Sequence, residues 1–480
     1  MTIAPHEYLR KHNKSSCDVV VVGAGLAGSQ AALTCAKQGL TVLLYEMRPH
    51  VCSPAHHSDK PAELVCSNSL KSDVCINAAG LLKRELHILG SDLLSVAYQT
   101  RVPAGGALAV DREEFSKRVE EALEAHPLID ILREEFISLD QVPCGVPVII
   151  AGGPLCSESL TNQLVPLVGK ELNFFDAAAP IIQADSLNSE RVFYASRYGK
   201  GGGDDYLNIA LNQEEYDVFY QALVGAERVV KKEFETSDLF NACQPVEEIA
   251  RKGYDALRYG VMKPVGIDDP RTGRWPYAVV QLRAETKDKS SYNMVGFQTN
   301  LTWGEQKRVF GLLPGLEQAE YDRFGVMHKN TFINAPRVQA VDLSLKDNNS
   351  IFLAGQITGT EGYTEAIASG LIAGLNVAAR LKGLEPFILP ECTAFGSLMA
   401  YAHTEDTKAY QPMHVNYGIM NPLESRVKNK RDRYKHYALR SVKALAEYCN
   451  KRSKEFALSD SPAQNSAAII DEVVHFETTR

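Results

Sequence analysis

The sequence has 480 residues, of which 45% are hydrophobic and 23% charged, and its formal net charge is −8. A chain of this size and composition can bury a substantial core in one large domain or two interlocked domains. The charge excludes a polycationic protein, so a nucleic-acid contact requires a local basic patch on an acidic body. Residues 1–16 contain no apolar signal segment and no apolar run reaches the length of a membrane span, which predicts a cytoplasmic protein without membrane contact.

The ten cysteines do not form a metal-binding pattern. None are spaced as Cys-x-x-Cys, and no group of cysteines and histidines has zinc-finger spacing. His56 and His57 are adjacent, so in a strand they would point to opposite faces, and we expect no metal site. Free cysteines within strands and helices are usually small buried apolar residues. We expect this of Cys17, Cys35, Cys144 and Cys156.

The first elements in chain order form a β-α-β unit. The run Val19-Val-Val-Val22 is a β-branched stretch of the kind that is buried on both faces of a parallel sheet. A glycine-rich turn follows, and an Ala-rich helix then extends to about Gln38, with Gly39 at the position of its C-cap. A second strand covers residues 41–46, and default chirality makes the unit right-handed.

The turn of this unit has the spacing of a dinucleotide site. Its sequence is Gly23-Ala24-Gly25-Leu26-Ala27-Gly28, with a strand before it and a helix after it. The glycines permit a tight turn and let backbone N–H groups and the helix N-terminus approach a pyrophosphate. Glu46 closes the second strand about twenty residues on, where an acid accepts hydrogen bonds from the adenosine ribose.

The β-α rhythm continues and is then interrupted. Residues 49–77 are irregular, and a loop of that length is usually functional or disordered. Helices are predicted at 78–90, 112–125 and 157–167, and strands at 129–134 and 146–151. From 180 to 336 alternating strands, aromatic residues and loops replace this rhythm, which returns with a strand at 350–355 and a helix at 364–381. Residues 426–454 predict a charged helix with eleven Lys and Arg, and 457–480 predict a disordered tail.

The second strand–helix unit identifies the nucleotide. A strand ends at Gly355-Gln356, and the small-residue helix that follows can lie close to a bound cofactor. Two-part FAD domains carry such a unit near their C-terminal end, whereas a plain Rossmann methyltransferase does not need it. We therefore predict an α/β protein with a Rossmann-like FAD-binding domain of the two-dinucleotide-binding flavoprotein type, interrupted by an inserted α+β domain. The predicted boundaries are 17–179 and 337–423 for the FAD-binding domain, 180–336 for the insertion, 424–456 for the basic helix and 457–480 for the tail.

Two cysteines have distinctive settings. Cys66 lies in the long loop after the second strand, followed by the polar residues Ser67, Asn68 and Ser69, and Cys243 lies in the insertion close to Pro245. A dithiol reductase would show Cys-x-x-x-x-Cys shortly after its first FAD unit, and this sequence does not. Both cysteines are therefore candidates for another kind of thiol chemistry.

From about residue 17 to 423 the sequence closely resembles the folate- and FAD-dependent tRNA uracil-5-methyltransferases. The motifs include Tyr45-Glu-Met-Arg-Pro49, Ala62-Glu-Leu-Val-Cys-Ser-Asn-Ser-Leu70 and Cys243-Gln-Pro-Val-Glu247. Others lie at 102–112, 196–200, 257–264, 269–273, 295–299, 304–307, 324–328 and 411–416. The tRNA wobble-uridine carboxymethylaminomethyl enzymes share the FAD units, but they resemble this sequence less and carry an extra C-terminal helical domain.

The resemblance implies C5 methylation of a tRNA T-loop uridine, with methylene-tetrahydrofolate as carbon donor and FAD reduced by NADPH or NADH. It implies that Cys243 adds to C6 of uracil and that Cys66 is a second thiol near the flavin that can serve as the base for the C5 proton. Which thiol has which role remains open. Met47 and Arg48, directly after Glu46, are expected to join the cofactor site.

Three alternatives remain open on the sequence alone. They are the same chemistry on ribosomal RNA, an NAD(P)H–flavin oxidoreductase acting on a small molecule, and a flavin-bearing RNA-binding protein that is not an enzyme. The Lys200-Gly-Gly-Gly203 loop and the basic helix are possible RNA contacts. Tyr277, Trp303 and Tyr363 could stack on a base or on folate, and no role is assigned to them.

Overall fold

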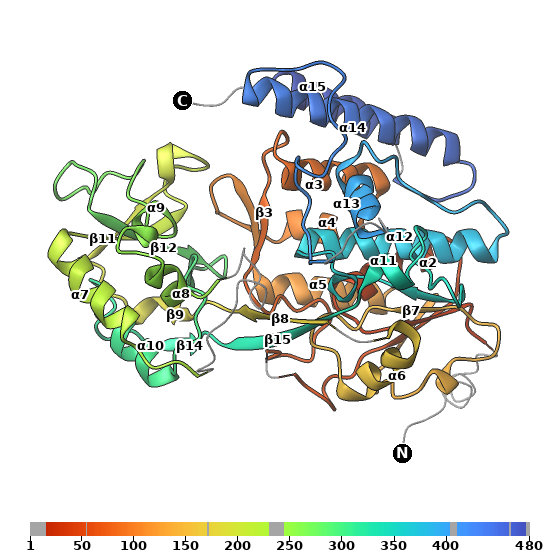
Figure 1. Ribbon diagram of the computed structural model, residues 1–480, viewed down its shortest axis with the longest axis horizontal. Coiled ribbons are helices and arrows are strands. Elements are labelled where there is room, and N and C mark those ends of the chain that lie inside the picture. Colours follow the sequence, from red (N-terminus) through yellow and green to blue (C-terminus); the bar gives the residue numbers. More distant parts are fainter. Residues whose placement is uncertain are drawn as a thin grey trace.

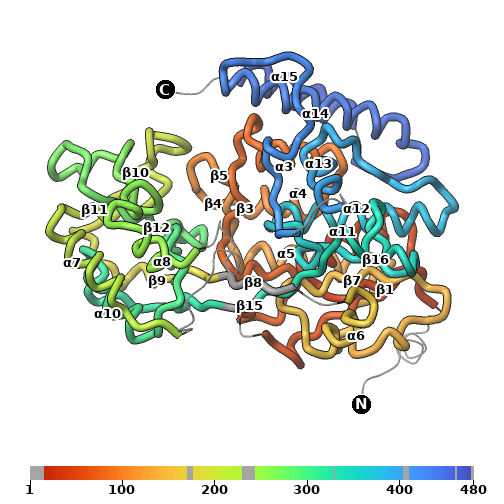
Figure 2. Tube along the Cα trace, in the orientation of Figure 1, coloured from red at the N-terminus to blue at the C-terminus, as the bar shows by residue number. Residues whose placement is uncertain are grey.

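The computed structural model describes residues 16–53, 55–169, 172–229, 244–403, 410–459 and 462–476. Figure 1 shows two lobes, a larger one that contains both ends of the described chain and a smaller one built from the middle of the sequence. Two antiparallel strands, β8 (Leu172–Ala177) and β15 (Met327–Phe332), connect the lobes, and Figure 2 shows them side by side between them.

A five-stranded parallel sheet forms the centre of the larger lobe, in the order β16-β7-β1-β2-β6. Its central strand β1 pairs with β2 in the register Val19↔Val42 and with β7 in the register Val20↔Val148. The valines of β1 are buried, as expected for a strand covered on both faces. The strands are β1 (Val19–Val22), β2 (Val42–Tyr45), β6 (Ile129–Leu132), β7 (Val148–Ile150) and β16 (Ile351–Leu353).

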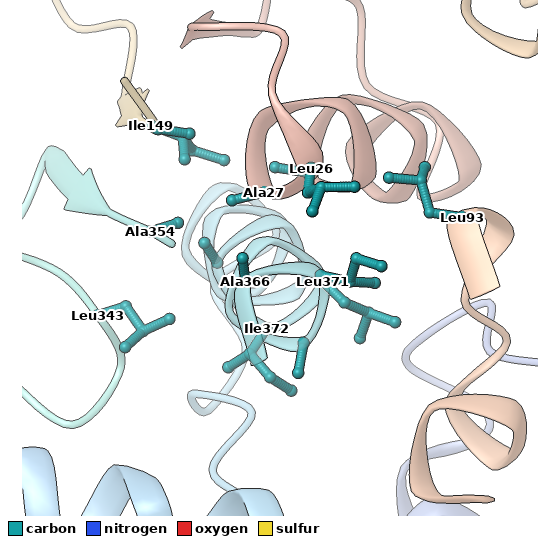
Figure 3. Packing of buried hydrophobic residues seen from close by; sticks show 14 of the residues in the cluster. Leu26, Ala27, Leu93, Ile149, Leu343, Ala354, Ala366, Leu371 and Ile372 are labelled. Atoms are coloured by element: carbon teal, nitrogen blue, oxygen red, sulfur yellow. The ribbon is translucent and has the colours of Figure 1, made fainter. Parts of the chain in front are cut away.

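Helices α2 (Leu26–Lys37) and α12 (Tyr363–Leu381) pack tightly together, although one belongs to the first nucleotide unit and the other to the second. A Cβ atom at Gly370 would lie 2.0 Å from the carbonyl oxygen of Ala27, so only glycine permits this approach. Figure 3 shows Leu26 and Ala27 of α2 facing Ala366 and Leu371 of α12. The contact joins the two sequence-distant units into one domain.

The rest of the larger lobe surrounds this core. A small sheet in the order β3-β5-β4 lies toward the smaller lobe. Its strands are β3 (Ser69–Ser72), β4 (Arg101–Val102) and β5 (Ala107–Val110). The helices are α3 (Ala78–Leu89), α4 (Asp92–Gln99), α5 (Arg112–Glu124), α6 (Glu158–Val168), α11 (Ala335–Val338) and α13 (Ala394–His403), with short 3-10 turns at Leu139–Gln141 and Gln356–Thr358.

The smaller lobe is an antiparallel sheet with helices, in the order β10-β11-β12-β13-β9-β14, and it has its own hydrophobic core. Its strands are β9 (Ile181–Gln183), β10 (Val192–Ala195), β11 (Tyr206–Leu211), β12 (Ala278–Ala284), β13 (Ser291–Met294) and β14 (Tyr321–Arg323). Its helices are α7 (Gln213–Val224), α8 (Val246–Arg251), α9 (Ala256–Tyr259) and α10 (Trp303–Phe310), with 3-10 turns at Ala184–Ser186 and Arg197–Gly199.

The prediction of a disordered tail at 457–480 is wrong for most of that segment. Helix α15 (Pro462–Val474) packs on the basic helix α14 (Lys430–Arg452) and on α3. Its buried residues, Ser466, Ile469 and Val473, recur at helical spacing, and Glu472 forms an ion pair with Arg84. The sparse apolar stripe was missed because most of its neighbours are small or polar.

The prediction for the four cysteines is half right. Cys17 and Cys35 are buried, whereas Cys144 is exposed and Cys156 is half-buried, because the latter two lie in loops rather than in regular elements. Among the described residues, no helix is long and apolar enough to cross a membrane. Within the same ranges, no group of three or more His, Cys, Asp or Glu side chains could hold a metal ion.

Candidate functional site

A cleft of about 1020 Å³ crosses the carboxyl ends of the strands of the parallel sheet. It is lined by residues that lie one or two positions after the ends of β1, β2, β6, β7 and β16. Loops at this edge of an open parallel sheet are the usual place for a nucleotide. Residues of both the first and the second nucleotide unit therefore line the same cleft.

The glycine turn after β1 forms one wall of the cleft. Gly23, Gly25, Leu26 and Ala27 line it. Gly25 is the N-cap of α2, and a Cβ built on it meets no atom within 4 Å, so the space beside this backbone is open for a ligand. The N–H groups of the first turn of α2 carry the positive end of the helix dipole, which suits a pyrophosphate.

Two residues of the predicted turn, Ala24 and Gly28, do not line the cleft. The backbone N–H of Ala24 donates to Oε2 of Glu46 at 2.9 Å. A Cβ at Gly28 would lie 1.8 Å from the carbonyl oxygen of Gly23, so this glycine allows the helix to leave the turn closely. Both residues therefore shape the turn and lie behind the ligand-facing surface.

Glu46 and Arg48 form a buried ion pair at the end of β2. Nε of Arg48 donates to Oε1 of Glu46 at 2.7 Å, and both side chains are less than 5% exposed. Burial by itself would raise the pKa of Glu46, but the hydrogen bonds and charge of Arg48 outweigh it and hold that pKa below its ordinary value. Glu46 is therefore an ionised acceptor that lines the cleft together with Met47 and Arg48.

Gly355 and Gln356 form the opposite wall. Gly355 has φ +85°, and a Cβ there would lie 2.8 Å from Cβ of Ala27, so glycine is required for the two nucleotide units to meet. Nε2 of Gln356 donates to Oε2 of Glu361 at 2.6 Å. This bond fixes the side chain of Gln356, which lines the cleft and carries an amide oxygen that can accept a hydrogen bond.

The sequence did not identify several residues that line the cleft. His56 lines it, with Nδ1 2.7 Å from Oγ of Ser53; burial, aided by the charge of Arg48, lowers the pKa of His56 to about 4, so the ring is neutral. Arg48 also donates to Glu63 at 3.2 Å. A further set of residues that line the cleft follows β6 and β7, so the alternation of strands and loops in the sequence could have suggested them. They are Glu134, Glu135, Phe136, Gly152, Gly153, Pro154 and Leu155.

Cys66 lies beside the end of the cleft that Val65 and Tyr363 line. The backbone N–H groups of Cys66 and Ser67 donate to the hydroxyl oxygen of Tyr363 at 2.8 and 3.2 Å, and Sγ of Cys66 lies 3.7 Å from the carbonyl oxygen of Ala177. Tyr363 starts α12, so the second nucleotide unit positions the cysteine loop directly. The thiol is half-buried at the junction of cleft, small lobe and connecting strands.

Buried arginines add positive charge around Cys66. Arg112 pairs with Glu285 at 3.1 Å and donates to the carbonyl oxygen of Leu64 at 2.6 Å. Arg283 donates to Oδ1 of Asn68 at 2.7 Å, and the thiol is close enough to act electrostatically on both guanidinium groups. Arg283 lies in β12 and Glu285 directly follows this strand, so the small lobe completes this site. Guanidinium groups there can stabilise a transient anion.

Cys243 lies outside the residues that the structure describes. Both described flanks of its segment contact the 298–302 stretch: N–H of Val229 donates to the carbonyl oxygen of Asn300 at 2.8 Å, and N–H of Val246 donates to that of Gln298 at 2.7 Å. Glu247 is fully buried beside them and accepts hydrogen bonds from N–H of Asn300 and Oγ1 of Thr299.

Replacing Glu247 with glutamine is expected to change how stability depends on pH. Burial raises the pKa of Glu247 to about 7, so between about pH 4.5 and 7 the folded state keeps a proton that the unfolded state has released. This group's contribution to stability therefore falls as the pH rises through that window, by at most about 3 kcal/mol. Melting temperatures at pH 5 and pH 8 should show a wild-type advantage over Glu247→Gln that shrinks at the higher pH.

The control for this measurement is Thr299→Val, which removes a hydrogen bond to the carboxyl group but keeps the titrating group. It should lower the melting temperature at both pH values and still lose stability between pH 5 and pH 8, because Glu247 still titrates. Since the Thr299 hydrogen bond lowers the pKa of Glu247, this loss should be no smaller than in wild type. A difference between wild type and Glu247→Gln that is the same at pH 5 and pH 8 would contradict the assignment.

The parallel sheet, its two packed nucleotide units and the cleft across its carboxyl ends define a two-part dinucleotide-binding fold of the flavoprotein class. Residues 18–385 match the family described as glucose inhibited division protein A. Among solved structures, GidA of Aquifex aeolicus has a TM-score of 0.67 at 17% identity, covering 95% of this chain and 76% of that chain. This second likeness concerns the fold alone.

Curated relatives are much more similar. The chain is 53% identical over 425 residues to methylenetetrahydrofolate–tRNA-(uracil-5-)-methyltransferase TrmFO of Moorella thermoacetica. The aligned region covers 88% of this chain and 96% of the relative. This chain is 52% identical over 427 residues to the TrmFO of Geobacter sulfurreducens, with 89% and 98% coverage. The chain belongs to the TrmFO family of methylenetetrahydrofolate–tRNA-(uracil-5-)-methyltransferases. The resemblance and the α/β fold class predicted from the sequence are confirmed.

Proposed function

We infer that this chain methylates C5 of a uridine in the T-loop of tRNA, taking the carbon from methylenetetrahydrofolate. The observation that carries this inference is membership of the TrmFO family over almost the whole length of its relatives. The position of Cys66 at the inner end of a dinucleotide cleft supports it, because the proposed chemistry requires a thiol close to the cofactor. The site of action is the cytoplasm, where tRNA is found.

The residues of the cleft fit FAD. The open space beside Gly25 and the N-terminus of α2 would hold the pyrophosphate, Glu46 the adenosine ribose, and Gly355 with Gln356 the ribityl arm. FAD bound there supplies two electrons, taken from NADPH or NADH, which convert a carbon at the formaldehyde oxidation level into a methyl group. In this proposal residues 17–179 and 337–423 bind the cofactor, and residues 180–336 help bind the RNA.

Uracil C5 becomes nucleophilic only when a thiolate adds to C6. We assign that addition to Cys243, which forms an Sγ–C6 bond and turns the ring into an enolate. The guanidinium groups of Arg112 and Arg283 lie near the second thiol and would stabilise this anion. After C5 has taken up the carbon, Cys66 removes the C5 proton, the enolate re-forms the C5–C6 double bond, and the thiolate of Cys243 leaves.

The test combines the enzyme with NADPH, deuterium-labelled methylenetetrahydrofolate and unmodified tRNA, followed by mass spectrometry of the digested nucleosides. Labelled 5-methyluridine is expected in the T-loop, and none should form without folate. If the FAD is bound and reducible but tRNA gains no label, the proposal fails. The same reaction with ribosomal RNA would then show whether only the RNA was wrong, and NADPH oxidation without RNA would indicate a small-molecule oxidoreductase.

A further inference from the structure

Trp303 is an exposed aromatic side chain on a stack of three rings. It is 61% exposed, yet its indole is stacked on the ring of Phe324, with 5.3 Å between centroids and an interplanar angle of 14°. Phe324 is in turn stacked on Tyr321, at 4.8 Å and 18°. Tyr321 lies in β14, which is paired with β9, so the stack rests on the sheet of the small lobe.

The position of Trp303 in its helix excludes a role in the core. Helix α10 buries Gln306, Val309 and Phe310 against the small-lobe core, whereas Trp303 belongs to its exposed first turn. The helix is capped by Thr302, whose Oγ1 accepts a hydrogen bond from N–H of Glu305. An exposed tryptophan that is held parallel to two other rings presents a flat, preorganised surface.

This surface is connected to the Cys66 loop and to the described residues that precede the Cys243 segment. On the Cys66 side, Arg323, which lies between Tyr321 and Phe324 in sequence, donates to the carbonyl oxygen of Val65 at 3.3 Å. On the other side, N–H of Thr302 donates to the carbonyl oxygen of Glu227 at 3.1 Å, close to the point where the chain enters the segment of Cys243. Figure 1 shows α10 and β14 together at the lower edge of the small lobe, next to the connecting strands.

A cation accompanies the rings. Nζ of Lys307 lies 5.6 Å from the centroid of Phe324, and its side chain is exposed. The neighbouring Arg308 is held by Glu305, but among the described residues no carboxylate lies within ion-pair distance of Lys307. An aromatic platform with an adjacent unpaired cation matches the pattern by which proteins bind unpaired nucleotides, with the base on the ring and the phosphate on the cation.

We propose that Trp303, supported by Phe324 and Tyr321, is a stacking subsite for an unpaired base of the RNA substrate next to the target uridine. This inference rests on the proposed function and names the residue that holds the RNA loop in place. The pterin ring of folate is also flat and aromatic, but in the proposed function it passes its carbon to the cofactor in the cleft. Trp303 does not line that cleft and belongs to the exposed surface of the small lobe. The RNA base is therefore the occupant that the structure favours.

The sequence provides a matched control, because it has two tryptophans, Trp303 and Trp275. Trp275 is 58% exposed and also lies in the small lobe, but it lines a separate pocket with Arg258 and Arg271. Trp303→Ala should weaken the binding of unmodified tRNA by roughly 10- to 100-fold, as expected for the loss of one stacked base. Trp303→Phe should recover most of the affinity, and Trp275→Ala should leave it unchanged.

Fluorescence separates RNA from folate as the occupant. In Trp275→Phe the only tryptophan is Trp303, and its emission should be quenched by a T-arm hairpin RNA, whereas Trp303→Phe should show no RNA-dependent change. Quenching by methylenetetrahydrofolate alone, or equal affinity losses in Trp303→Ala and Trp275→Ala, would overturn the proposal. Since binding and quenching are measured without turnover, they remain informative even if labelled 5-methyluridine never forms and the proposed function fails. Bound FAD and an unchanged melting temperature show that each variant is folded.

Discussion

The variant Gly25→Glu is expected to purify as a colourless protein that has lost its flavin and all methylation activity. Gly25 caps α2, and a Cβ on this residue meets no protein atom within 4 Å. The added side chain therefore projects into the space proposed for the pyrophosphate without disturbing the protein around it. Its carboxylate would also repel the phosphates at the place where the helix N-terminus attracts them. The visible absorption spectrum of the purified protein measures the loss.

Gly304→Glu is the matched control for this experiment. A Cβ on Gly304 also meets no atom within 4 Å, but this residue lies in α10 of the small lobe, far in sequence from the cleft. It should purify yellow. Gly25→Glu should melt like wild-type apoprotein, because a ligand that binds only the folded state stabilises it and its loss removes that increment. A yellow and active Gly25→Glu would show that the pyrophosphate does not lie at this turn.

The nucleotide-binding half of the fold was predictable because its signals are local. A buried β-branched strand, a glycine turn, an Ala-rich helix and a closing acid occur within 28 residues, and each has a direct backbone or hydrogen-bonding reason. The structure places Gly25, Glu46 and Gly355 around one cleft as the sequence suggested. The pairing of α2 with α12 was not predicted, since the small residues of the second helix suggested only a close approach to a cofactor. In the structure Gly370 also permits the close approach of the two helices.

The remainder of the site was not predictable because it depends on contacts between distant segments. Tyr363 supports the Cys66 loop from nearly 300 positions away in sequence, and Arg112 meets Glu285 across the two lobes. No period or motif of a single sequence encodes such pairs. The motif also did not distinguish Ala24 and Gly28, which shape the turn, from the residues of the turn that line the cleft. Sequence alone also could not select Trp303 from the other aromatic residues, because exposure and ring stacking are tertiary properties.

The variant Cys243→Ala is expected to keep its FAD and to form no detectable 5-methyluridine. Without the thiolate that adds to C6, C5 of uracil has no enolate character and cannot attack the one-carbon unit. Cys66→Ala should also keep its FAD, and its turnover should fall by about 100- to 10,000-fold, the usual effect of losing a general base. The amount of labelled 5-methyluridine measures the loss of activity in both variants. The control is Cys52→Ala, which removes an exposed cysteine of the loop after β2 and should stay active.

The two thiols can be distinguished because they act at different times. RNA with 5-fluorouridine at the target position has no C5 proton, so an enzyme that has added to C6 remains covalently attached to it. Wild type and Cys66→Ala should both form this complex, which migrates slowly on a denaturing gel, and Cys243→Ala should not. With ordinary RNA, Cys66→Ala should accumulate an adduct that carries the new carbon but cannot lose its C5 proton. If Cys66→Ala instead abolishes the complex and Cys243→Ala forms it, the roles of the two cysteines are reversed, and the thiol at the end of the cleft is the nucleophile.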